Sequence, residues 1–202
     1  MTDETDPRVD PVQPSDAPDA VREVYDEIVA TREGEMADEM SLNGMWLSYG
    51  QTPELLRIVW DHMRESYRGG ELSFELTSKV SLVAATVLSC EACRIFHQER
   101  LESEGVEEGV IAALGDADIE QSAFDEREYV VLRFTQEVAE NLGGVTDADV
   151  DRLREVGLSE AEIVELVDCI ALHVHTAVFQ DTLGLAHEEM SADDYAGVAE
   201  LD

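Results

Sequence analysis

The sequence predicts an all-α fold, and three observations lead to this prediction. Apolar residues recur at helical spacing in successive segments, no segment shows the alternating pattern of a half-buried strand, and helix start and stop signals separate the segments. Because 44% of the residues are apolar, the chain can form a substantial core. We predict one helical domain over residues 16–186, preceded by a flexible acidic arm (1–15) and followed by an acidic tail (187–202).

The first half of the chain contains three predicted helices. They cover residues 16–32, 52–67 and 73–88, and residues 41–50 form a short apolar segment between the first two. Thr52 and Pro53 form a typical helix start, with proline at the first helical position. The segment 73–88 is rich in alanine and valine and carries no charge after Lys79, so we expect it to be a buried helix.

The second half contains the remaining predicted helices. They cover residues 89–104, 106–114, 125–142, 146–155 and 159–182. The last of these helices is apolar on most sides, which predicts a position at the centre of the fold or in a subunit interface. Its expected core stripe consists of Ile163, Val167, Ile170, Ala171, Val174 and Val178.

The formal net charge of −34, from 47 acidic and 13 basic residues, excludes several classes of partner. Such a surface repels nucleic acid and anionic membranes, and at low salt it also repels itself. We infer a protein adapted to molar salt, where the Debye length falls to about 3 Å. The sequence shows no apolar run of transmembrane length and no signal-peptide pattern at Met1, and its three cysteines suit a reducing compartment, so we predict a cytoplasmic protein.

Two of the three cysteines, Cys90 and Cys93, form a C-x-x-C motif, and His97 follows four residues after the second. On a helix all three side chains share one side. Ser89 is a favourable N-cap residue, so we expect a helix that begins there and holds both cysteines in or near its first turn. The helix N-terminus and a nearby imidazolium would favour thiolate over thiol, as a dithiol–disulfide cycle requires.

Two other interpretations of this motif stay open. Helical cysteines can be inert buried residues, and a structural zinc site would need a further ligand from Cys169, His173 or His175. His173 and His175 lie two residues apart, so they point to different sides of a helix and make a poor metal pair. Cys169 is most simply interpreted as a buried apolar residue.

Residues from about 42 to 115 resemble the carboxymuconolactone decarboxylase-like, or alkylhydroperoxidase AhpD-like, helical family. The family pattern is a buried helix, C-x-x-C, three residues and a histidine, which corresponds here to Cys90, Cys93 and His97 after the segment ending at Leu88. Residues 153–158 and the long helix after them resemble the C-terminal half of the peroxidase-related, two-part members. The resemblance implies an AhpD-like multi-helix bundle.

The resemblance also implies a thiol-dependent peroxidase that reduces alkyl hydroperoxides, and we predict no cofactor and no bound metal. In the family the second cysteine, here Cys93, attacks the peroxide, and the first, here Cys90, resolves the sulfenic acid to a disulfide. His97 would belong to the proton relay. The implied partners are a thiol reductant, such as a lipoyl or thioredoxin-like protein, and further copies of the chain in a homo-oligomer, with a trimer or hexamer expected and a dimer also compatible.

One family position differs in this chain. The family usually has a glutamate twelve residues before the first cysteine, and here that residue is Ser78, which cannot act as a carboxylate base. The nearest upstream acid, Glu75, is the candidate replacement. Because this change predicts reduced peroxidase activity, a non-enzymatic redox sensor or dithiol interaction module is the alternative hypothesis. Retention of both cysteines disfavours a decarboxylase-type lyase.

The acidic surface leads to a first prediction, on salt. The free energy of unfolding should be greater at about 2 M KCl than at about 0.1 M, because salt screens the repulsion among surface carboxylates. Urea unfolding followed by circular dichroism at both concentrations measures the difference. Stability that is unchanged, or greater at low salt, would remove the inference of adaptation to molar salt.

Overall fold

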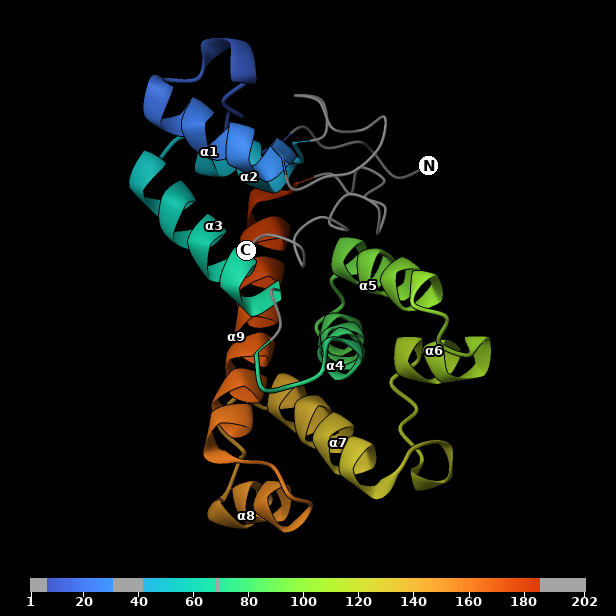
Figure 1. Cartoon of the computed structure of the whole chain (residues 1–202). Helices are drawn as coiled ribbons and strands as arrows, with labels where there is room; N and C mark the ends of the chain where they lie inside the picture. Colours follow the sequence, from blue (N-terminus) through green and yellow to red (C-terminus); the bar gives the residue numbers. More distant parts are fainter. Residues whose placement is uncertain (1–6, 31–41, 68–69, 186–202) are drawn as a thin grey trace. The chain divides into compact units, whose positions relative to one another are not determined.

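The computed structural model describes residues 7–30, 42–67 and 70–185, and all regular structure in these ranges is helical. The α-helices are α1 (Asp19–Ala30), α2 (Gly44–Tyr49), α3 (Pro53–Tyr67), α4 (Phe74–Val87), α5 (Glu91–Ser103), α6 (Glu108–Gly115), α7 (Glu126–Glu140), α8 (Asp147–Glu155) and α9 (Glu160–Leu183). Two short 3-10 segments are η1 (Pro14–Asp16) and η3 (Gln121–Ala123). The all-α prediction is confirmed, and a helix is present in each predicted segment (Figure 1).

The chain forms two compact units, which are described separately. Unit 1 consists of residues 1–68 and 178–202, and unit 2 consists of residues 69–177. Helix α9 contributes its longer N-terminal part to unit 2 and its last turns to unit 1. The assignment of residues 16–186 to a single domain stays a prediction, and the predicted tail at 187–202 lies outside the described residues.

The described part of the predicted N-terminal arm is hydrogen bonded within unit 1. The Val12 N–H donates to the Leu47 carbonyl at 2.9 Å, and the Arg8 N–H donates to the Leu183 carbonyl at 2.8 Å. The Arg8 guanidinium also donates to the Thr182 carbonyl at 2.6 Å, so it satisfies carbonyl groups at the C-terminal end of α9. The flexibility predicted for this arm is not tested by these contacts.

Aromatic side chains of α1, α2 and α3 form the core of unit 1. Trp46 and Trp60 are almost fully buried and pack edge to face, with ring centroids 5.7 Å apart. Tyr25 is also buried, and its hydroxyl donates to the Trp46 carbonyl at 3.3 Å. Tyr49 stacks on Phe179, from the end of α9, at 4.1 Å. Burial of these large apolar rings stabilises the unit.

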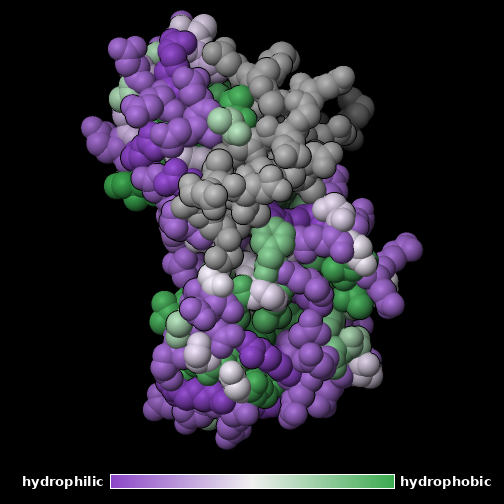
Figure 2. All heavy atoms as spheres, viewed as in Figure 1, coloured by the Kyte–Doolittle hydropathy of each residue, from purple (hydrophilic) through white to green (hydrophobic). Residues whose placement is uncertain are grey.

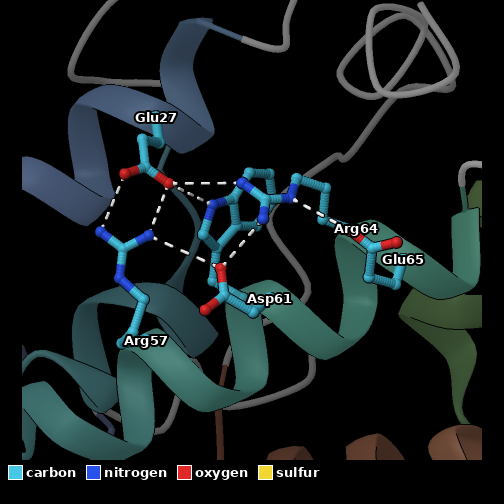
Figure 3. A network of polar contacts seen from close by, with 6 residues as sticks. Glu27, Arg57, Asp61, Arg64 and Glu65 are labelled. Atoms are coloured by element: carbon cyan, nitrogen blue, oxygen red, sulfur yellow. Dashed lines mark hydrogen bonds and ion pairs between the residues drawn. The ribbon is translucent and has the colours of Figure 1, made fainter. Parts of the chain in front are cut away.

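A network of charged side chains joins α1 to α3 (Figure 3). Arg57 donates two hydrogen bonds to the Glu27 carboxylate, at 2.6 and 2.9 Å, and the indole N–H of buried Trp60 donates to the same carboxylate at 2.9 Å. Arg64 lies 3.7 Å from Glu27 and 3.2 Å from Asp61. The hydrogen bonds from Arg57 hold the pKa of the Glu27 carboxyl below its usual value. Glu27 is therefore the common acceptor of the network.

Helix α4 lies at the centre of unit 2, where α5, α6 and α7 pack around it; Figure 1 shows α4 end-on between them. Nine of its 14 residues are buried, which confirms the prediction from its small and apolar composition. Lys79 is buried as well, and its ammonium group forms ion pairs with Glu75 at 2.6 Å and with Glu128 of α7 at 2.7 Å. These partners compensate the cost of burying the charge.

The face that α9 buries differs from the predicted one. Its buried residues are Ile163, Leu166, Cys169, Ile170, Leu172, His173, Thr176 and Ala177. Val167 and Val178, which the predicted stripe includes, are 44% and 61% exposed. The predicted stripe is confirmed at Ile163 and Ile170 and wrong at Val167 and Val178. Because α9 carries apolar side chains on most sides, periodicity alone does not select a face.

Among the coloured residues of Figure 2, hydrophilic side chains predominate, with smaller apolar patches between them. The exposed large apolar residues in the described ranges are Leu55, Ile58, Ile95, Leu142, Val145, Val164, Val167 and Val178. Within those ranges, no helix combines the length and the apolar character needed to cross a membrane.

The Glu27 network yields a prediction on stability. Replacing Glu27 by glutamine removes the charge and keeps the shape, and we expect a loss of about 1 kcal/mol in the free energy of unfolding because these hydrogen bonds are partly exposed. Asp26→Asn, at an exposed position on the same helix, should be neutral and is the control. Urea unfolding at one salt concentration compares the three proteins. Equal stability of the Glu27→Gln variant and the wild type would show that the network contributes nothing.

Candidate redox site

The corner between α4 and α5 sets the position of both cysteines. Helix α4 ends at Val87, and Ser89 has a left-handed backbone with φ of 57°. The Ser89 N–H donates to the Thr86 carbonyl at 3.0 Å and the Cys90 N–H to the Ala85 carbonyl at 2.9 Å, a pattern typical of a helix C-cap. The N-cap of α5 is Cys90. The prediction that Ser89 caps this helix is wrong because Ser89 serves to end α4.

A disulfide joins Cys90 and Cys93 at the start of α5, with Cα atoms 5.4 Å apart. Cys90 is 1% exposed. Cys93, the third residue of the helix, is half-buried. The two sulfur atoms therefore differ in environment, and Cys93 is the more accessible of the pair.

The first turn of α5 favours a thiolate at Cys93 in the reduced protein. Backbone N–H groups at a helix start have no partner within the helix, and the helix dipole adds positive potential there. This potential stabilises a negatively charged sulfur. Glu91 lies in the same turn, but Arg94 donates two hydrogen bonds to its carboxylate, at 3.0 and 2.6 Å, and so offsets its negative charge.

His97 and His173 form a buried hydrogen-bonded pair. His97, one turn after Cys93 on α5, is 1% exposed, and His173 of α9 is 3% exposed. Their Nε2 atoms are 2.9 Å apart, and Nδ1 of His173 lies 2.8 Å from the Cys169 carbonyl oxygen. Helix α9 thus supplies a partner for His97 that is 76 residues away in the sequence.

Burial favours the neutral form of both histidines. Burial is the main cause that lowers the pKa of His97 well below its usual value, and electrostatic interactions with His173 and Arg100 act in the same direction. Burial also lowers the pKa of His173, and the hydrogen bond to the Cys169 carbonyl opposes this shift. The expected imidazolium beside the thiols is wrong because desolvation dominates. At neutral pH the pair instead offers a proton acceptor.

Thr176 is a second residue of α9 at the site. Its hydroxyl oxygen lies 3.9 Å from the Cys93 sulfur, and its O–H group donates to the His173 carbonyl at 3.2 Å. The sequence indicates His173 only as a possible zinc ligand, and it does not indicate Thr176. Both are polar side chains on the buried face of a largely apolar helix, where a polar group needs a partner, but the apolar pattern of α9 does not select that face.

Ser78, at the position of the family glutamate, lies beside a different carboxylate. Burial raises the pKa of the Glu104 carboxyl at the end of α5, and Arg100 at 3.4 Å and the Ser78 hydroxyl oppose that shift. Glu75, the predicted replacement, forms its ion pair with Lys79, and its side chain is 56% exposed. The relay role of Glu75 stays a prediction, and Glu104 is the carboxylate that Ser78 contacts.

The third cysteine, Cys169, lies in an unreactive environment. Its sulfur is 3.5 Å from the Ser81 hydroxyl oxygen, and burial raises the pKa of the thiol to about 11. The interpretation of Cys169 as a buried apolar residue is confirmed. Of the other residues considered as zinc ligands, His173 is bonded to His97, and His175 is on the exposed side of α9. In the described part of the chain, no three His, Cys, Asp or Glu side chains are grouped to hold a metal ion.

Comparison with known proteins gives matches at the level of structure. No family model and no curated protein matches this chain. A peroxidase-related protein of Ralstonia eutropha JMP134, described as an alkylhydroperoxidase AhpD core, has a TM-score of 0.75 at 16% identity over 95% of this chain and 96% of that one. A peroxidase-related protein of Silicibacter sp. TM1040 has a TM-score of 0.72 at 16% identity over 98% of both chains.

A third similar structure is that of the debrominase Bmp8, solved as a cysteine-to-alanine variant in complex with 2,3,4-tribromopyrrole. Its TM-score is 0.73 at 17% identity, over 96% of this chain and 99% of that one. Identities this low show the fold alone. The chain therefore has the AhpD-like, carboxymuconolactone decarboxylase-like fold, which confirms the resemblance seen in the sequence at the level of fold. This fold serves more than one reaction, so the site must carry the functional argument.

The buried histidines predict a loss of stability in acid. The lowered pKa of His97 and His173 means that below the usual value of 6.5 the unfolded chain binds protons that the folded chain does not. Stability should therefore be fully present above that value and fall below it, by up to about 1.4 kcal/mol per pH unit for each histidine.

Urea unfolding between neutral pH and about pH 5 measures this slope. The double variant His97→Gln/His173→Gln should show a shallower dependence, and His175→Gln, at an exposed position, should keep the wild-type slope. Equal slopes in the wild type and the double variant would contradict the prediction.

Proposed function

We propose that this protein is a thiol-dependent peroxidase that reduces organic hydroperoxides through a Cys90–Cys93 dithiol–disulfide cycle. The observation that carries the proposal is the disulfide at the start of α5, one helical turn from the buried His97–His173 pair. A thiol nucleophile needs a nearby base, and a cycle needs a second thiol that captures the oxidised sulfur. The peroxidase-related proteins with the same fold support the assignment.

In the first step, Cys93 is the attacking residue. His97 accepts the thiol proton, and the thiolate attacks the terminal oxygen of the hydroperoxide. An S–O bond forms, the O–O bond breaks, and the alkoxide leaves as an alcohol with the proton returned by His97. The greater accessibility of Cys93 and its place in the first turn of α5 favour it over buried Cys90 for this role.

In the second step, Cys90 resolves the oxidised sulfur. Its thiol attacks the Cys93 sulfenic acid, an S–S bond forms, and water leaves. The cycle closes when an external dithiol reduces the disulfide, and a lipoyl or thioredoxin-like protein is the reductant we propose. The cysteines lie within one turn, so resolution needs no large rearrangement of α5.

The proposal predicts which cysteines are needed. With cumene hydroperoxide and a dithiol reductant such as dihydrolipoamide, the wild type should consume peroxide, and Cys93→Ser should fall to the uncatalysed rate. Cys90→Ser should form one sulfenic acid per chain, detectable by dimedone labelling, and then stop. Cys169→Ser is the matched control, because that cysteine is buried with a raised pKa, and its rate should equal that of the wild type.

Two results would contradict the proposal. If the wild type consumes no more peroxide than Cys93→Ser with any of several dithiol reductants, the protein is not a peroxidase, and the redox-sensor hypothesis takes its place. If a bromopyrrole is debrominated while peroxides are not consumed, the dithiol acts on a different electrophile. His97→Gln should slow the peroxide step by about 10²-fold or more, as loss of a general base does.

A further inference from the structure

The hydrogen-bond partners of the histidine pair determine its tautomers. A carbonyl oxygen only accepts, so His173 donates its Nδ1–H to the Cys169 carbonyl, 2.8 Å away. A neutral imidazole carries one N–H, so Nε2 of His173 bears a lone pair. Nε2 of His97 lies 2.9 Å from that lone pair and must therefore donate. His97 is thus the Nε2–H tautomer, and its lone pair is on Nδ1.

We propose that His173 is a positioning residue that holds His97 in the Nε2–H tautomer, so that Nδ1 is the nitrogen through which His97 accepts the thiol proton. The proposal rests on the proposed peroxidase cycle for the source of the proton, and on the two hydrogen bonds of His173 for the tautomer. Without an acceptor at residue 173, His97 would populate both tautomers. One of them carries its proton on Nδ1 and cannot accept another there.

The same hydrogen bond serves the charged form of His97. After proton uptake at Nδ1, the imidazolium still donates Nε2–H to His173, and this bond becomes charge-assisted. His173 stays anchored by the Cys169 carbonyl throughout. Arg100, on the same helix as His97, is a second positive group that acts on it, and it favours return of the proton to the leaving alkoxide. His173 therefore keeps its hydrogen bonds at each stage of the transfer.

The tautomers can be observed directly in the wild type. Long-range ¹H–¹⁵N correlation spectra of protein labelled at histidine nitrogens, recorded at about pH 7.5, distinguish Nδ1–H from Nε2–H forms. Spectra of His97→Gln and His173→Gln assign the signals. We expect the Nε2–H form for His97 and the Nδ1–H form for His173. A His97 signal in the Nδ1–H form, or averaged between the two, would overturn the proposal whether or not the protein reduces peroxides.

Two variants at residue 173 separate positioning from packing. His173→Gln retains an amide oxygen that can accept from His97, whereas His173→Leu has no acceptor. His175→Gln, on the exposed side of the same helix, is the matched control. In a Cys90→Ser background, alkylation of Cys93 by iodoacetamide reports thiolate formation without any peroxide. Relative to the Cys90→Ser protein, His173→Leu should react at least about 10-fold more slowly. His173→Gln and His175→Gln should each react at a rate within about 3-fold of that of the Cys90→Ser protein.

The outcomes are distinct from those of the peroxidase assay. A His173→Leu variant that keeps both the Nε2–H form of His97 and the alkylation rate would overturn the positioning role. A His173→Gln variant as slow as His173→Leu would do the same. If the wild type shows the expected tautomers and alkylation pattern but consumes no peroxide, the peroxidase proposal fails and the positioning role stands. If His173→Leu does not fold, the tautomers in the wild-type spectrum and the alkylation rate of His173→Gln test the positioning role.

Discussion

The site depends first on the way α4 ends. Because this helix is uncharged and apolar after Lys79, the core of unit 2 forms around it, and its C-terminus is fixed by that packing. Ser89 takes a left-handed conformation that costs a non-glycine residue roughly 1–2 kcal/mol. Two capping hydrogen bonds and the burial of α4 offset this cost. The strained residue turns the chain so that Cys90 becomes the N-cap of α5, and the disulfide pair then lies at the positive end of a helix.

Location, and not residue type, separates the reactive groups from the inert ones. Cys169 is as much a thiol as Cys93, but full burial raises its pKa to about 11, whereas Cys93 is half-buried at a helix start. The histidines follow the same rule. His97 and His173 are buried, and their lowered pKa keeps them in the neutral form at neutral pH, in which an imidazole nitrogen carries a lone pair. In the proposed cycle, a helix start that favours the thiolate and a buried neutral histidine pair that accepts the proton are complementary requirements of one proton transfer.

The sequence predicted the helices well, because the signals that begin and end them are local. Ser73 and Asp125 cap α4 and α7, and Thr146 opens α8 with a capping box, all within a few residues of the helix that each begins. The C-x-x-C motif and His97 could be placed together for the same reason, since they share one helix. The role of His173 could not be predicted, because it depends on the packing of α9 beside a helix 76 residues earlier. The apolar pattern of α9 did not select the buried face, and without that face nothing separates His173 from His175.

The acidic surface and the site rely on interactions of different range. A net charge of −34 acts through solvent over long distances, and molar salt reduces that range to about 3 Å. The contacts of the histidine pair, at 2.8 and 2.9 Å, are direct hydrogen bonds between buried groups that are neutral at rest, so mobile ions neither reach nor screen them. Surface charge outside the core of unit 2 should therefore leave the proposed proton transfer unaltered. Lys79 is consistent with this separation, since its buried charge is neutralised by Glu75 and Glu128 within the unit and does not depend on solvent ions.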